Sequence, residues 1–166
     1  RLAEALSADG AEPQARWRHL EVSKLVSDKR LYSEWDDAQG ASIFDEDLLQ
    51  QAMKQEFQEQ CCGHVVDFHC SDCFPSDIGM PLGVFVLRAD TSSIFDRLAA
   101  RGYPQQKITE NVECEIFGTV REEVQDVFGD TNVTIKELSS NNMRDLEANV
   151  ATVVDSVRAW VASRTV

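Results

Sequence analysis

Basic residues are scarce in this chain of 166 residues, where 16 lysines and arginines stand against 29 aspartates and glutamates. The formal net charge is -13. Proteins that bind a nucleic-acid backbone gain much of their affinity when a basic surface displaces counterions from the phosphates. A chain this acidic has no broad basic face to offer, so we expect no direct nucleic-acid partner.

Long apolar runs are also missing. No run approaches the roughly 20 residues that a membrane span needs, and residues 1–6 contain neither a signal-peptide core nor a cleavage pattern. The five cysteines are an odd number, and Cys61 and Cys62 are adjacent, which is a poor basis for a disulfide framework. These features predict a soluble intracellular protein in a reducing compartment, without a membrane partner.

Glycine and proline are few, at 8 and 4, while 43% of the residues are hydrophobic. That is enough apolar material for one globular domain spanning residues 1–166, and it argues against a disordered or fibrous chain. Apolar runs at 64–68 and 83–87 are typical of buried parallel strands, and residues 17–22 and 133–138 alternate as shorter strands do. Helical spacing of apolar residues covers 1–7, 24–32, 45–60, 91–101, 108–128 and 143–161.

Strands and helices thus alternate along the chain, which predicts an α/β domain whose parallel sheet is covered by helices on both faces. Residues 33–42, an acidic segment that contains a glycine, are expected to form a connection. Ligands of such sheets bind at the carboxyl ends of the strands. The residues that follow the runs at 64–68 and 83–87 are therefore the first candidates for a functional site.

Residues 61–73, CCGHVVDFHCSDC, gather four cysteines, two histidines and two aspartates. A strand in the middle of this segment would hold Cys62 and Cys70 about 26 Å apart, too far for one zinc ion with Zn–S bonds of about 2.3 Å. The candidate zinc ligands are then reduced to Cys70, Cys73 and His69, and a single Cys-x-x-Cys pair is a weak signal. The alternative is that these thiols pack as small apolar side chains around a strand and its loop.

Asp67 ends the first apolar run, at the predicted carboxyl edge of the sheet. This is the position of a Walker-B acid, which holds water around Mg²⁺. Alternatively, the carboxylate caps the following turn. His69 would lie on the same side as Asp67 if the strand continued, and otherwise it is a loop histidine without a role. The spacing alone leaves both interpretations open.

Arg88, Arg97 and Arg101 form a second concentration of candidate residues, one at a strand end and two at i, i+4 spacing on a helix. Guanidinium groups near strand ends can pair with phosphate oxygens. The alternative is a favourable interaction with the C-terminal end of the helix and with nearby carboxylates such as Asp90.

Six short strings occur in a characteristic order and spacing: FDED at 44–47, VVDFH at 65–69, DCFP at 72–75, VFVLRADT at 84–91, RLAARGY at 97–103 and ECEIF at 113–117. Together they resemble the adenylate kinase isoenzyme 6 family, nuclear ATPases that interact with coilin and take part in small-subunit ribosome assembly. The resemblance runs from about Trp17 to the last helix.

The resemblance implies a P-loop nucleoside-monophosphate-kinase fold: a parallel five-stranded sheet flanked by helices, a monophosphate-binding insertion at about 21–44 and a lid at about 100–110. It implies an ATP:AMP phosphotransferase with ATPase activity that uses ATP, AMP and Mg²⁺. Such a protein is expected to be a monomer in the nucleus and cytoplasm, linked to small ribosomal subunit maturation through a ribosomal protein partner. The alternative is an ATP-gated assembly factor for that ribosomal protein, with weak AMP kinase activity.

The resemblance also implies roles for individual residues. Asp67 and His69 stand at the family's Asp-x-His variant of the Walker-B motif, with Asp67 near Mg²⁺ through water. Arg101 matches the lid arginine that contacts the ATP phosphates, and Arg97 matches the arginine on the preceding helix. Asn142 falls in the loop where the family contacts adenine.

The monophosphate-binding insertion departs from the family pattern. Residues 23–27 read SKLVS where the family carries Gly-Asp-Leu-Ala-Arg, so Ser27 replaces the arginine expected on the AMP phosphate. Lys24, Lys29 and Arg30 are the candidates to take over that role.

The Gly-x-x-x-x-Gly-Lys-Ser/Thr loop of the family occurs nowhere in the sequence, and residues 1–6 match the helix that follows it. We therefore expect the first, central strand and its P-loop to be absent from these 166 residues. Without the backbone N–H groups and the lysine of that loop, the β and γ phosphates lose their main cradle, so the 166 residues alone are expected to lack kinase activity.

Overall fold

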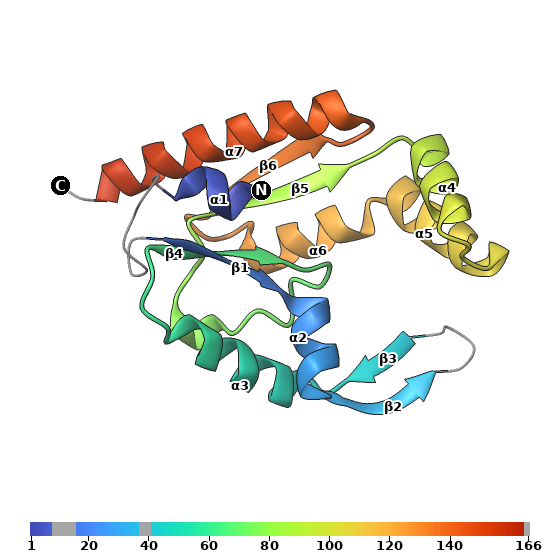
Figure 1. The fold of residues 1–166 in the computed structure, drawn as a ribbon, viewed down its shortest axis with the longest axis horizontal. Helices are drawn as coiled ribbons and strands as arrows, with labels where there is room; N and C mark the ends of the chain where they lie inside the picture. Colours follow the sequence, from blue (N-terminus) through green and yellow to red (C-terminus); the bar gives the residue numbers. More distant parts are fainter. Residues whose placement is uncertain (8–15, 37–40, 165–166) are drawn as a thin grey trace. The chain divides into compact units, whose positions relative to one another are not determined.

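The computed structural model describes residues 1–7, 16–36 and 41–164 (Figure 1). They form two compact units, Arg1–Met80 and Pro81–Val166, which are described one after the other. Each unit combines a parallel pair of strands with helices, which confirms the predicted α/β class. None of the helices in the described ranges is both long and apolar enough to cross a membrane.

The first unit contains a parallel pair of strands, β1 (Trp17–Glu21) and β4 (Gly63–Asp67). The register aligns Trp17 with Gly63 and Glu21 with Asp67, so both strands end at the same edge. A Cβ atom at Gly63 would lie only 2.6 Å from the Trp17 ring, which explains the glycine there. The other elements of this unit are α1 (Leu2–Leu6), α2 (Val22–Lys29), β2 (Tyr32–Asp36), β3 (Ala41–Phe44), α3 (Glu46–Phe57) and the 3₁₀ helix η2 (Ser76–Ile78).

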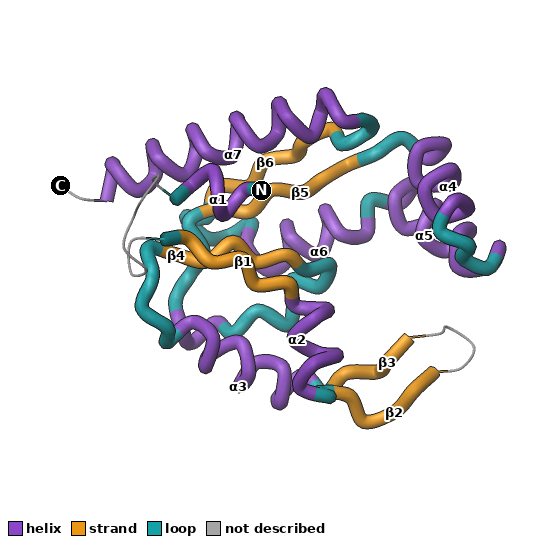
Figure 2. Tube along the Cα trace, in the orientation of Figure 1, coloured by secondary structure: helices purple, strands orange, loops and turns teal. Residues whose placement is uncertain are grey.

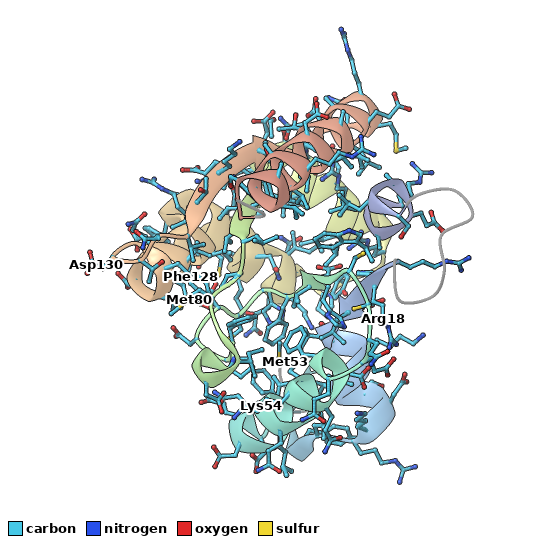
Figure 3. All side chains as sticks on the ribbon, turned by 90° about the vertical axis from the view of Figure 1, so that its left-hand side faces the viewer. Arg18, Met53, Lys54, Met80, Phe128 and Asp130 are labelled. Carbon is cyan, nitrogen blue, oxygen red and sulfur yellow. The ribbon has the colours of Figure 1, made fainter. Side chains whose placement is uncertain are left out.

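The core of the first unit gathers the apolar faces of α2 and α3. Helix α3 begins where the Asp45 carboxylate accepts a hydrogen bond of 3.0 Å from the backbone N–H of Leu48, an N-cap that satisfies one end group of the helix. Leu49 and Met53, one turn apart, are completely buried, whereas Lys54, which is labelled with Met53 on α3 in Figure 3, forms an ion pair with Asp77 of η2. Burial of each large apolar side chain contributes about 1.5–3 kcal/mol.

The second unit contains the other parallel pair, β5 (Gly83–Arg88) and β6 (Thr134–Ser139). Helices α6 and α7 both contact this pair and lie on opposite sides of it (Figures 1 and 2). The Trp160 ring of α7 lies 5.5 Å from the Phe85 ring between centroids, where a side chain at Gly83 would collide with it. The helices of this unit are α4 (Thr91–Ala100), α5 (Gln105–Phe117), α6 (Thr119–Phe128) and α7 (Met143–Arg164).

The strands of the described ranges pair two by two. The family resemblance implies one parallel sheet. The structure shows parallel pairing in two places, between β1 and β4 in the first unit and between β5 and β6 in the second. Residues 33–42 were expected to form a connection, and this prediction was wrong at both ends of the segment. Strands β2 and β3 run antiparallel there, and residues 37–40 lie outside the described ranges.

Two predicted helices have different ends in the structure. The helix expected over 24–32 ends at Lys29, because Arg30 adopts a left-handed conformation with φ of 53°. The helix expected over 108–128 is two helices, because Gly118 has φ of 69° and separates α5 from α6. The apolar spacing continues across that glycine, which is why periodicity alone did not show the break.

Candidate functional site

The carboxyl edge of the β1–β4 pair presents the acid predicted from the sequence. Asp67 is the last residue of β4, and its side chain is 71% exposed. The neighbouring strand contributes Glu21, which is the partner of Asp67 in register, and His19, whose Nε2 lies 3.8 Å from Asp67 Oδ2. An exposed carboxylate and an imidazole thus share one strand edge.

The exposed Asp67 carboxylate fits the hydrated Mg²⁺ that the family resemblance implies. Mg²⁺ keeps several waters and is usually held by one or two carboxylates together with substrate phosphates. Among the residues that the structure describes, no group of three or more His, Cys, Asp or Glu side chains is placed to hold a metal. Because its carboxylate is exposed, Asp67 can accept hydrogen bonds from the waters of a hydrated ion. Residues 61–73 contain no group of ligands placed as a zinc site would need.

The imidazole next to Asp67 belongs to His19, which the sequence prediction missed. His69 lies in the loop after β4, is exposed, and packs its ring edge-on against Phe68 with 4.9 Å between centroids. The alternation at 17–22 places His19 and Glu21 on one face of a strand. Only the parallel pairing with β4, which joins residues far apart in the sequence, brings that face beside Asp67.

A cavity of about 470 Å³ that is wide open to solvent lies in the second unit, at the carboxyl edge of the β5–β6 pair. Its size is within the range of small-molecule sites, and its place follows the rule for ligands of parallel sheets. The polar residues that line it come from both strand ends, from the loops that follow them, and from α4 and α5: Arg88, Asp90, Thr91, Glu115, Ser139 and Asn141.

Arg88 is held by carboxylates at this cavity. Its Nε donates to Glu115 Oε1 at 2.5 Å, its Nη2 donates to the Glu115 carbonyl oxygen at 3.1 Å, and its Nη1 donates to Glu137 Oε2 at 3.3 Å. The hydrogen bond that Arg88 donates to Glu115, together with the charges of Glu115 and Glu137, raises the pKa of the Arg88 guanidinium. The structure therefore supports the interpretation in which Arg88 pairs with nearby carboxylates over the one in which its guanidinium binds a phosphate.

The two asparagines before α7 have different tasks. Asn142 Oδ1 accepts hydrogen bonds from the backbone N–H groups of Arg144 and Asp145, at 2.9 and 3.0 Å, and so caps the helix. Asn141 Oδ1 accepts from the backbone N–H of Asp90 at 2.7 Å and ties the two strand ends together at the cavity. The loop predicted to contact adenine thus borders the cavity through Asn141, and a direct contact from Asn142 stays a prediction.

Arg97 and Arg101 lie at the C-terminal end of α4, and both are exposed. The backbone N–H of Arg101 donates to the Arg97 carbonyl at 3.3 Å, and a turn with Gly102 at φ of 75° leads into α5. The predicted lid at 100–110 is therefore the connection between two contacting helices together with the first turns of α5. Both guanidinium groups are accessible to phosphate oxygens there. Because Asp67 is in the other unit, its convergence with Arg101 on one nucleotide stays a prediction.

The three candidates for the AMP side lie at α2. Lys29 Nζ forms an ion pair of 2.9 Å with Glu56 Oε1 of α3, so its charge is already engaged. Lys24 and Arg30 are exposed, as is Ser27 at the position of the family arginine. Contact of these residues with AMP stays a prediction.

Comparison with known proteins first gives the class: a family model described as an AAA domain matches residues 1–118. Together with the parallel strands and the acid at the end of β4, this match defines a P-loop protein of the nucleotide-kinase type. Relatives at least 30% identical over most of the chain carry the name adenylate kinase isoenzyme 6 homolog, so the chain belongs to that family, which confirms the resemblance.

Named relatives cover most of the chain. An adenylate kinase isoenzyme 6 homolog of Plasmodium falciparum is 33% identical over 86% of this chain and 76% of its own length. A homolog of the same name from Caenorhabditis elegans is 36% identical over 82% of this chain and 72% of its own length. A putative adenylate kinase of Saccharolobus islandicus is 30% identical over 68% of this chain and 57% of its own length.

Proposed function

We propose that this protein is an ATP:AMP phosphotransferase that also hydrolyses ATP, with Mg²⁺ as its cofactor. The observation that carries the proposal is the exposed Asp67 carboxylate at the end of a parallel strand, 3.8 Å from the His19 imidazole. Phosphoryl transfer requires little covalent chemistry from the protein and depends on positioning and on neutralising charge. Mg²⁺, when bound, supplies charge stabilisation at the phosphates.

Different residues of the chain then bind the metal, the phosphates and the base. Asp67 would hold the hydrated metal through a water, which would supply charge stabilisation at the phosphates, and His19 lies beside that carboxylate, with its Nε2 3.8 Å from Asp67 Oδ2. Arg97 and Arg101 bind phosphate oxygens from the end of α4, where their guanidinium groups are exposed. The cavity at the β5–β6 edge binds the adenine base of the nucleotide. Asn141 borders this cavity, and Asn142 lies in the same loop.

The first test replaces Asp67 in the full-length protein. Asp67→Asn keeps the shape of the side chain but removes its charge, so we expect Mg²⁺-dependent turnover to fall at least about 10-fold in a coupled assay of ADP formation. Asp155→Asn on the exposed face of α7 removes the same charge elsewhere and is expected to leave turnover unchanged. An unchanged Mg²⁺ dependence in Asp67→Asn would remove this residue from the site.

A second candidate function is an ATP-gated assembly factor for a small-subunit ribosomal protein, acting as a monomer in the nucleus and cytoplasm. The net charge of -13 favours a basic partner, because complementary charge speeds association. Ser27, which stands where the family carries an arginine, favours weak use of AMP.

Steady-state ATP consumption discriminates the two functions. ATP consumption that depends strongly on AMP supports the phosphotransferase. ATP consumption that ignores AMP but changes when a basic small-subunit ribosomal protein is added supports the assembly factor instead.

A further inference from the structure

Cys70 and Cys73 place their sulfur atoms side by side in the loop after β4. The two Sγ atoms are 2.9 Å apart. Cys73 is 1% exposed and belongs to the core of the first unit, and Cys70 is partly buried against the same core. The backbone turn that contains Cys73 is closed by a hydrogen bond of 3.0 Å from the Phe74 backbone N–H to the Ser71 carbonyl. Packing of both cysteines at the same core keeps the two thiols together.

The other three cysteines have different surroundings. Cys61 Sγ lies 3.5 Å from the Gly63 carbonyl oxygen and 3.6 Å from the His64 ring nitrogens. Cys62 and Cys114 are exposed. The sulfur pair at 70 and 73 also lacks the further ligands that a metal would need, within the ranges described by the structure. A dithiol, rather than a metal site, fits this geometry.

We propose that Cys70 and Cys73 form a reversible intramolecular disulfide, which makes the loop after β4 a redox-sensitive element. A disulfide has an S–S distance of about 2.05 Å, so closure requires the sulfurs to approach by only about 0.9 Å. Disulfides in reducing compartments are usually transient and redox-sensing rather than structural.

The chemistry balances with a glutathione disulfide as the oxidant. The thiolate of the more accessible Cys70 attacks one sulfur of glutathione disulfide, and one glutathione leaves. The sulfur of Cys73, having lost its proton, then attacks Cys70 Sγ in the mixed disulfide and releases the second glutathione. Two protein thiols are oxidised and one glutathione disulfide is reduced to two glutathiones.

The position of the pair gives the disulfide a functional consequence, which rests on the proposed function. Asp67 lies three residues before Cys70, and His69 lies directly before it. Closing the bond across residues 71 and 72 reduces the freedom of the loop that leads away from the predicted metal-binding carboxylate. We therefore expect oxidation to alter Mg²⁺-dependent turnover as well as the thiol count.

The test uses the full-length protein in glutathione buffers of graded oxidation, followed by acid quenching, alkylation and peptide mass spectrometry. Trypsin releases residues 55–88 as one peptide, so Cys61→Ser/Cys62→Ser is used as the background that isolates the pair. Oxidation is expected to remove both alkylation sites. The oxidised peptide should be lighter by two hydrogen atoms than the same peptide with both thiols reduced and unalkylated. Dithiothreitol should restore both sites.

Two variants separate the disulfide from other oxidation. In Cys73→Ala, Cys70 should accumulate as a mixed disulfide with glutathione, because the second thiol is missing. In Cys70→Ser, which keeps the core cysteine, the mass loss should disappear. If both thiols of the folded background protein remain alkylatable in every buffer, the proposal is wrong. A disulfide that forms without any change in turnover would keep the redox pair and count against its link to the proposed function.

Discussion

Arg88 shows, at the scale of a residue, how this acidic chain neutralises a strand end. Its side chain is 30% exposed and donates to Glu115, whose side chain is 18% exposed, and to Glu137. Because Arg88→Gln leaves Glu115 without its cation, we expect the free energy of unfolding to fall by about 2 kcal/mol in urea denaturation. The matched variant Arg121→Gln removes a 59% exposed partner of the same Glu137 and should cost at most about 0.5 kcal/mol. Equal losses in the two variants would contradict this account.

Single residues of the site were predictable to the extent that local pattern defines them. Asp67 follows from a strand-end position, which an apolar run shows directly. His19 does not, because its place beside Asp67 depends on which strands pair and in which register. The capping role of Asn142 could be recognised from its position before a helix, whereas the link from Asn141 to Asp90 joins two loops 51 residues apart in the sequence.

At the scale of elements, strongly patterned segments matched the prediction and polar ones did not. The runs at 64–68 and 83–87 became β4 and β5, but the prediction that both strands are buried was wrong: β4 is half-buried before the exposed Asp67, and Leu87 of β5 is 58% exposed. Strands β2 and β3 escaped detection, because backbone pairing between two short segments does not need an apolar run. The ends of two helices were not predicted either, because a residue in the left-handed conformation does not change the spacing of apolar residues along the sequence.

The break at Gly118 gives a prediction for the α5–α6 connection. A residue with a side chain at φ of 69° is strained, and no atom comes closer than 4.0 Å to a Cβ built there, so the cost is conformational rather than steric. We expect Gly118→Ala to lower the free energy of unfolding by about 1 kcal/mol and Gly118→Asn to cost less, because asparagine tolerates the left-handed region. Chemical denaturation measures both. Equal stability of the alanine variant and the original protein would show that the connection adapts by joining α5 and α6.

At the scale of the whole molecule, the alternation of strands and helices was enough for the α/β class, and six short strings were enough for the family. The contacts that fix each pair of strands were not predictable, because they depend on distant partners. Trp17, for example, fills the space over Gly63, and Trp160 fills the space over Gly83. Such glycines carry no signal in the sequence until the aromatic ring opposite is known.

The last prediction concerns what these 166 residues can do alone. The described part of the chain offers exposed arginines and a strand-end carboxylate, but the sequence contains no Gly-x-x-x-x-Gly-Lys-Ser/Thr loop to supply backbone N–H groups and a lysine to the β and γ phosphates. We expect the 166-residue chain to show no ATP turnover above background in a coupled assay. Fusing it to the strand and P-loop of a relative should produce turnover, and replacing the P-loop lysine of that fusion by alanine should abolish it again. Turnover by the 166 residues alone would mean that Arg97 and Arg101 hold the phosphates without the loop, and the assignment of the phosphate site would then have to be revised.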